Sequence, residues 1–146
     1  MSASTKLSTS VKALCYLAQA YPEAKSSAEI ALHINVNASK LRKLLSMLVK
    51  NDLVESAKGT AGGFLLKRQP SLIHLQEIYC SIEDRKAFHL DVNRKNIHRD
   101  NVAVKFNDFF LDLFADIQID IEDKMRHITL NTIMKRTGIK YSYKEK

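Results

Sequence analysis

The sequence predicts a mainly α-helical fold with a small β-hairpin, arranged as a winged helix-turn-helix with a long C-terminal dimerisation helix. Three observations predict it. Apolar residues recur at three- and four-residue spacing in three consecutive segments, which is the period of amphipathic helices. A loop that holds three of the chain's four glycines then separates two short extended segments. Finally, a long helical pattern covers residues 99–126.

The first two helices are predicted from their period and their ends. The first covers residues 7–21, and Pro22 ends it because the residue before a proline avoids the helical conformation. Ser26 and Glu29 have the spacing of a capping box, which predicts that a short second helix begins here and runs to Ile34.

The third helix, residues 37–51 with Asn37 as its expected N-cap, is the predicted recognition helix. Its four leucines fall within about 100° of one another around the helix axis, so that face must be buried. Serines and basic residues point the other way, which suits contact with phosphates and base edges in a DNA major groove. A solvated surface helix is the alternative, and the capped helix before it and the hairpin after it favour DNA.

A hairpin is expected from residues 53–56, through the glycine-rich loop 58–63, to residues 64–66. As a wing, it would carry Lys58 towards phosphates. An ordinary turn without a ligand is the alternative. The loop lacks the spacing of nucleotide-binding glycine motifs, which excludes that function. The predicted DNA-binding residues of the recognition helix and the wing are Asn37, Ser39, Lys40, Arg42, Lys43, Lys50, Lys58 and Thr60.

The second half of the chain is predicted to hold a short helix over residues 73–82, a polar loop and the long helix. Thr129 is the expected cap of a last short helix that Gly138 ends. These elements give three parts: a DNA-binding domain over residues 1–82, a loop over residues 83–98, and a dimerisation region over residues 99–138.

The long helix carries an apolar stripe that one small domain could not cover alone, so a partner helix is its expected cover. Partial packing on the chain's own first helix is the alternative. Four aspartates, residues 108, 112, 116 and 120, form a second stripe, read as a solvated face or as a contact with basic residues of a partner. The predicted dimerisation residues are Phe106, Phe109, Phe110, Leu113, Phe114, Ile117 and Ile121.

Charge and composition limit the class of protein. The formal net charge is +7, and residues 1–70 hold ten basic residues against four acidic ones, so the basic excess lies in the predicted DNA-binding half. No secretory signal or membrane-length apolar run is present, which predicts a cytoplasmic protein. No catalytic triad or paired carboxylates are visible, so an enzyme is not predicted.

Only two cysteines are present, Cys15 and Cys80, which supports neither a disulfide framework nor a cysteine-rich metal site. Both lie among apolar residues, so both are expected to be small, buried and unreactive.

The sequence resembles the Rrf2 family of bacterial transcriptional regulators. The resemblance is carried by residues 10–18 (SVKALCYLA), 30–31, 37–48, 54–66 with Gly59 and the Gly62–Gly63 pair, and 73–78 (IHLQEI). It implies a winged-helix homodimer, held by its long helix, that binds a near-palindromic operator on double-stranded DNA and usually represses.

Two departures from the family pattern matter. The best-known sensing members carry three cysteines in the loop before the long helix, where they hold an iron–sulfur cluster. Residues 84–98 contain no cysteine, and His89 and His98 cannot replace three thiolates, so no cofactor or metal is expected. The family's early Gly-Arg-Tyr is Leu7-Ser8-Thr9 in this chain, so the phosphate contact that the family pattern implies is not carried over to these residues.

A sequence-specific DNA-binding regulator, most simply a repressor, is therefore the predicted function. The alternative is a winged-helix protein-interaction module without specific DNA binding, and the basic recognition helix counts against it. The sequence leaves the effector open, as either a small molecule or a redox signal.

Overall fold

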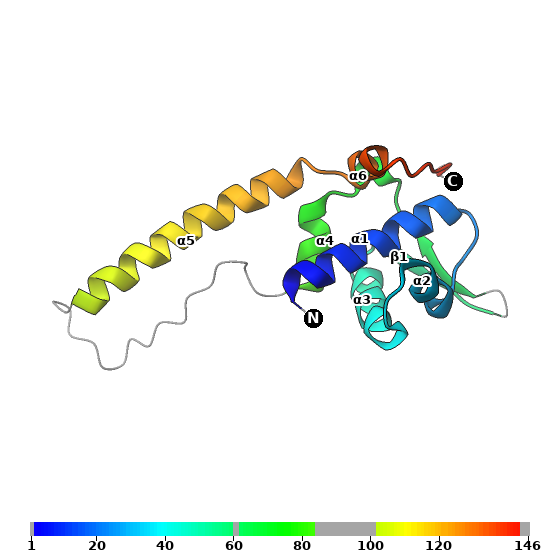
Figure 1. Cartoon of the computed structure of the whole chain (residues 1–146), viewed down its shortest axis with the longest axis horizontal. Coiled ribbons are helices and arrows are strands. Elements are labelled where there is room, and N and C mark those ends of the chain that lie inside the picture. The colour runs from blue at the N-terminus through cyan, green and yellow to red at the C-terminus, as the bar shows by residue number, and fades with distance from the viewer. Residues whose placement is uncertain (1, 60–61, 84–101, 144–146) are drawn as a thin grey trace.

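The computed structural model describes residues 2–59, 62–83 and 102–143. A helical domain with a β-hairpin is followed by one long helix, α5, that extends away from it (Figure 1). Part of the predicted loop over residues 83–98, the first turn of the predicted long helix and the wing residue Thr60 lie outside the described residues. The described elements confirm the predicted fold class.

Helices α1 (Ala3–Ala20), α2 (Ser27–Ile34) and α3 (Ala38–Lys50) form the helix-turn-helix part. Helix α1 begins four residues earlier than predicted because Ser2 caps it, accepting a hydrogen bond from the Thr5 backbone N–H. The predicted capping box of α2 is confirmed, since Ser26 and Glu29 exchange hydrogen bonds. The turn between α2 and α3 uses Asn35 in the left-handed conformation, with φ of 56°.

The predicted hairpin consists of β1 (Val54–Ala57) and β2 (Gly63–Leu66), which pair antiparallel with Val54 opposite Leu66. Lys25, just before α2, bonds to the outer side of β2: its N–H donates to the Phe64 carbonyl oxygen, and the Phe64 N–H donates back. A Cβ at Gly63 would lie 2.5 Å from the Lys25 carbonyl, so this close approach requires glycine. The hairpin is thereby fixed to the helical part.

Beyond the hairpin, the 3₁₀ turn η1 (Pro70–Leu72) leads into α4 (Leu75–Ile82), which His74 and Glu77 cap reciprocally. Helix α5 (Val102–Arg126) packs on α4 near its C-terminal end. The chain then returns to the domain as α6 (Leu130–Thr137), which Thr129 caps and Gly138 ends as predicted. Backbone hydrogen bonds of 2.8 Å, from Leu75 N to Ile128 O and from Leu130 N to Ile73 O, fix this return.

A single apolar core lies between α1, α2, α3, α4, the hairpin and α6. The four leucines of α3 are buried in it, as predicted. Helix α6 contributes Leu130 and Met134, so a segment far along the chain packs in the same core as the first four helices. Within residues 2–59, 62–83 and 102–143, every helix is too short or too polar to span a membrane.

Candidate nucleic-acid interface

The outward face of α3 is polar and exposed, because the core-facing leucines fix the rotation of the helix. Ser39, Lys40, Lys43 and Lys50 are all exposed, as the sequence predicted for a helix that presents a basic face. Met47 interrupts this face as an exposed apolar side chain.

The N-terminal end of α3 is stabilised by Asn37, whose side-chain oxygen accepts a hydrogen bond from the Lys40 N–H at 3.1 Å. This confirms the predicted N-cap, and leaves the Nδ2 group of Asn37 to donate elsewhere. Arg42 lies across the turn, where its Nε donates to the Ser27 hydroxyl of α2 at 3.1 Å. The sequence did not indicate a role for Ser27, since residues 15 apart give no local signal.

Ion pairing divides the basic residues of the first half into two groups. Lys6, Lys25, Lys67 and Arg68 each contact a carboxylate, from Glu83, Glu23, Asp52 and Glu77 respectively. Among the described residues, no ion pair involves Arg42 or the five lysines 12, 40, 43, 50 and 58. Four of these five lysines belong to α3 or the hairpin loop. Within the first half of the chain, the positive charge without an ion pair is thus concentrated on α3 and the hairpin loop. A second group of exposed basic residues without an ion pair in the described part of the chain, Lys135, Arg136 and Lys140, lies on α6 or just after it.

The hairpin loop begins with Lys58, which is exposed, and Gly59, with φ of 109°. The Gly62 N–H donates to the Gly59 carbonyl oxygen at 2.9 Å and closes the loop. A Cβ at Gly62 would lie 2.7 Å from the carbonyl oxygens of Ala57 and Gly59, so the turn needs glycine there. The loop is a tight turn that carries a lysine at its start.

The apolar stripe of α5 is exposed along most of its length. Phe106 and Phe109 are 58% and 59% exposed, and Phe110 and Leu113 are also exposed. Phe114, Ile117 and Ile121 are half-buried. Because α5 extends away from the domain (Figure 1), the alternative that the phenylalanines pack on the first helix is wrong.

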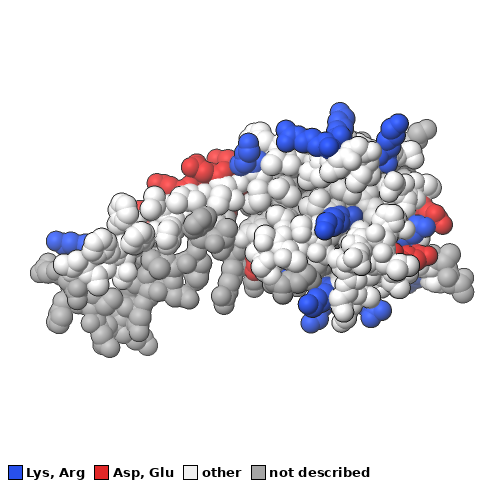
Figure 2. All heavy atoms as spheres, in the orientation of Figure 1, with Lys and Arg blue, Asp and Glu red and all other residues white. Residues whose placement is uncertain are grey.

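Acidic side chains follow one edge of the same helix, whereas basic side chains lie mainly over the domain (Figure 2). All four aspartates of the predicted stripe are exposed. The helix therefore presents an apolar face beside an exposed acidic one.

The two cysteines differ. Cys15 is buried as predicted, and burial raises the pKa of its thiol to about 11. The prediction that Cys80 is buried is wrong, because the side chain is exposed. Ile78 and Ile82 point into the core from the same helix, and Cys80, two residues from each, faces away from it.

The fold and the basic face together define a winged-helix DNA-binding regulator. The comparisons then identify the family: a family model described as an iron-dependent transcriptional regulator, Rrf2, matches residues 3–136, so the chain belongs to the Rrf2 family. This confirms the resemblance seen in the sequence. It also makes the protein a DNA-binding transcriptional regulator rather than an enzyme or a pure interaction module.

Two curated relatives come from Bacillus subtilis (strain 168), and both are named as HTH-type transcriptional regulators. YwgB is 28% identical over 116 residues, covering 80% of this chain and 72% of that protein. YwnA is 29% identical over 115 residues, covering 77% of this chain and 83% of that protein.

Solved structures share the fold. T. potens IscR has a TM-score of 0.67 at 25% identity, covering 99% of this chain and 94% of that chain. CymR, the global cysteine regulator of B. subtilis, has a TM-score of 0.65 at 22% identity, covering 90% of this chain and 95% of that chain. A transcriptional regulator from Lactobacillus plantarum has a TM-score of 0.78 at 18% identity, covering 91% of this chain and 89% of that chain. At this identity the likeness shows the fold alone.

The donor set does not fit an iron–sulfur cluster, although the family description mentions iron. Such clusters need thiolate ligands, and the whole chain has two cysteines. Cys15 lies inside the domain with a protonated thiol, and Cys80 lies on α4. Within the described residues, no group of three or more histidine, cysteine or acidic side chains is placed to hold a metal ion.

Proposed function

We propose that the protein binds a near-palindromic operator as a homodimer and represses transcription from it. The observation that carries the proposal is the concentration of unpaired lysines on α3 and the hairpin loop, described above. An unpaired lysine on a surface is free to neutralise a phosphate, which supplies much of the affinity of DNA-binding proteins.

The proposed DNA contacts divide by chemistry. Lys40, Lys43 and Lys50, which project from α3, would contact phosphates or guanine edges in the major groove, and Ser39 would contact either. Arg42 keeps its terminal guanidinium nitrogens for a phosphate while Ser27 holds its Nε. The Nδ2 group of Asn37 would donate a hydrogen bond to a phosphate of the DNA backbone. Lys58, together with Thr60, would place the wing on the adjacent phosphates.

The proposed dimer forms through α5. Its exposed phenylalanines and Leu113 would cost free energy if they remained in water, and a second α5 supplies a matching apolar surface under two-fold symmetry. A dimer of this kind would place two α3 helices in successive major grooves, about 34 Å apart. This arrangement explains why a near-palindromic site is the expected target.

The test is a gel-shift titration with DNA from upstream of the protein's own gene, with scrambled DNA of the same length as competitor. The Lys40→Glu/Lys43→Glu double variant should lose binding. Lys135→Glu/Arg136→Glu, an equal charge reversal at two exposed sites of α6, should retain it. Equal affinity for native and scrambled DNA, or full binding by the Lys40→Glu/Lys43→Glu variant, would contradict the proposal.

In a reporter strain, deletion of the gene should raise transcription from the bound promoter, and a fall would contradict repression.

A further inference from the structure

A pocket of about 300 Å³ lies between α1, α2 and α6, apart from the proposed DNA contacts. Its volume is at the lower end of the range of small-molecule sites. The lining residues are Val11, Lys12, Cys15, Tyr16, Gln19, His33, Ile34, Ile133, Thr137 and Ile139.

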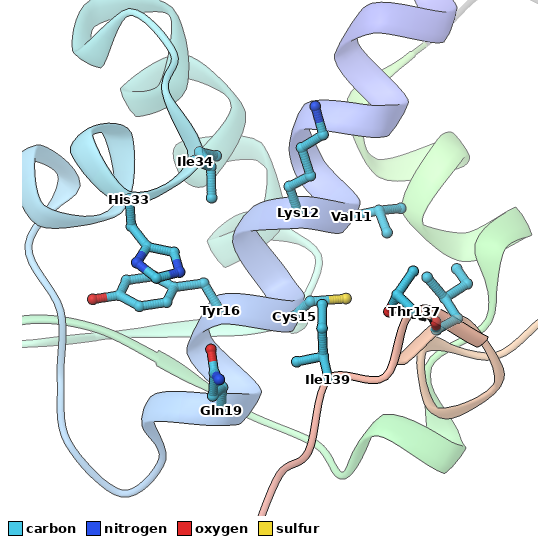
Figure 3. Close-up of a pocket in the computed structure, with 10 residues that line it drawn as sticks. Val11, Lys12, Cys15, Tyr16, Gln19, His33, Ile34, Thr137 and Ile139 are labelled. Carbon is cyan, nitrogen blue, oxygen red and sulfur yellow. Dashed lines mark hydrogen bonds between the residues drawn. The ribbon is translucent and has the colours of Figure 1, made fainter. Parts of the chain in front are cut away.

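The pocket has a floor and two walls from different parts of the chain (Figure 3). Residues of α1 form the floor. His33 and Ile34 of α2 lie on one side, and Thr137 and Ile139, at the end of α6, lie on the other. A molecule bound here would therefore touch both the helix that precedes the recognition helix and the segment that follows the long helix.

The lining is chiefly apolar, with a flat aromatic surface at one side. The rings of Tyr16 and His33 stack with centroids 4.0 Å apart and an interplanar angle of 15°. Val11, Ile34, Ile133 and Ile139 supply aliphatic surface, and the Cys15 sulfur points towards Thr137 (Figure 3). The Thr137 hydroxyl already donates to backbone carbonyls of α6, so it adds little polarity.

The lining of the pocket holds one lysine, one histidine and no acidic residue. Lys12 stands at one end, between Ile34 and Val11 (Figure 3). It is the one lysine of the unpaired group that lies neither on α3 nor in the hairpin loop. The Cys15 thiol carries no charge near neutral pH because burial raises its pKa to about 11. An apolar body with one negative end therefore complements this surface.

We propose that this pocket binds a small, mainly apolar carboxylic acid, with its carboxylate at Lys12 and its hydrocarbon part against Cys15, Ile34 and Ile139. The regulatory part of the proposal, that binding changes operator affinity, rests on the proposed function. Few contacts separate the pocket from the proposed DNA contacts. Helix α2 packs directly on α3, and backbone hydrogen bonds join the start of α6 to the segment before α4. A ligand that favours one placement of α2 relative to α6 shifts the protein between DNA-binding states.

Binding is tested on the full chain without DNA, with octanoate as the probe and 1-octanol and octylamine as its neutral and cationic counterparts. Backbone amide NMR titration should show saturable shifts at Val11, His33 and Ile139 with octanoate. Octanoate should bind about tenfold more tightly than 1-octanol, which is the order of magnitude of one hydrogen bond to a charged group. Octylamine should not bind.

Two methionine substitutions separate the charge from the rest of the surface. Lys12→Met keeps an unbranched apolar stem and removes the charge. It should weaken the binding of octanoate about tenfold while leaving the affinity for 1-octanol within about twofold. Lys135→Met, on the exposed face of α6, should change neither affinity. No saturable shift, shifts confined to α5, or equal loss of both probes in Lys12→Met would overturn the site. Pocket shifts that depend on protein concentration alone would also overturn it, because a second copy would then be the occupant.

The regulatory part is tested by repeating the operator titration with saturating octanoate. Operator affinity should change at least about fivefold, the lower end of allosteric coupling, and the change should be absent in Lys12→Met. An unchanged affinity with the pocket occupied would overturn regulation through this site. If the protein binds no operator at all, the proposed function fails, while the NMR result stands by itself.

Discussion

The side-chain oxygen of Asn37 accepts a hydrogen bond from the Lys40 backbone N–H at 3.1 Å, so one residue of the predicted interface also begins the recognition helix. The bond satisfies one of the N–H groups that the first turn of a helix leaves without a partner. It places the capping side chain beside the lysine that follows it, at the end of α3 where a phosphate would be favoured.

Two substitutions at Asn37 separate capping from DNA contact. Asn37→Ala removes the cap and should lower the free energy of unfolding by about 1 kcal/mol, measured by chemical denaturation. Asn37→Asp keeps a capping oxygen, so stability should remain close to that of the original chain. Its carboxylate would replace the Nδ2 donor and repel phosphates, so operator affinity should fall about tenfold. Undiminished affinity in Asn37→Asp would show that Asn37 is only a cap.

The hairpin lysine should contribute to the salt dependence of DNA binding. Lys58→Gln should lower the affinity for operator DNA and for scrambled DNA by similar factors, since a phosphate contact carries no sequence information. The slope of log affinity against log salt should become less steep by about two, because each subunit of the proposed dimer loses one phosphate contact. Fluorescence anisotropy over a salt series measures both quantities. Lys67→Gln is the control. Lys67 already pairs with Asp52 at 2.9 Å, so its substitution should leave the slope unchanged.

The exposed stripe of α5 should control oligomeric state. Phe106→Ser/Phe109→Ser removes the two most exposed phenylalanines of the stripe and should weaken the dimer at least about tenfold, since each buried large apolar side chain contributes about 1.5–3 kcal/mol. Sedimentation velocity measures the change. Asp116→Ser, on the solvated acidic stripe, is the matched control and should leave the dimer intact. If the original chain sediments as a monomer at all concentrations, the proposed dimer is wrong.

The cysteines should react differently in the folded protein. With its pKa raised to about 11 by burial, Cys15 remains a protonated thiol at pH 7.5, whereas Cys80 is exposed. A thiol reagent should therefore modify one cysteine rapidly, and Cys80→Ser should abolish that fast phase. Fast labelling of Cys15, located by mass spectrometry, would contradict the burial.

The same burial predicts a pH effect on stability. Because the pKa of Cys15 is higher in the folded state than its ordinary value of 9.0, the folded protein holds this proton more tightly. The resulting stabilisation is fully present below about pH 9 and is lost as pH rises towards 11, at about 1.4 kcal/mol per pH unit at most. Chemical denaturation of the original chain and of Cys15→Ala at pH 8 and pH 10 isolates the contribution of Cys15 to stability, because the other groups titrate equally in the two proteins. Parallel pH dependence in the two proteins would contradict the assignment.

Features that depend on near neighbours could be predicted from the sequence alone. The capping pairs Ser26–Glu29 and Asn37–Lys40 are three residues apart, and the leucines of α3 repeat within one helix. Helical period and capping are local physics, so residue order determines them. Residue order in the same way predicted three further features: the basic first half of the chain, the glycine turn and the uncovered apolar stripe of α5.

Other features needed the tertiary structure because they join residues far apart along the chain. Lys6 meets Glu83 across 77 positions, and Lys67 meets Asp52 across 15, and only these pairings show which lysines remain free for DNA. The exposure of Cys80 depended on how α4 is rotated on the core, which the apolar neighbours in sequence did not reveal. The pocket beside Lys12 exists because α6, more than 110 residues later, returns to pack near α1. The sequence by itself determined a basic winged helix with a long apolar helix, whereas long-range packing decided which charges are uncompensated and where a small molecule fits.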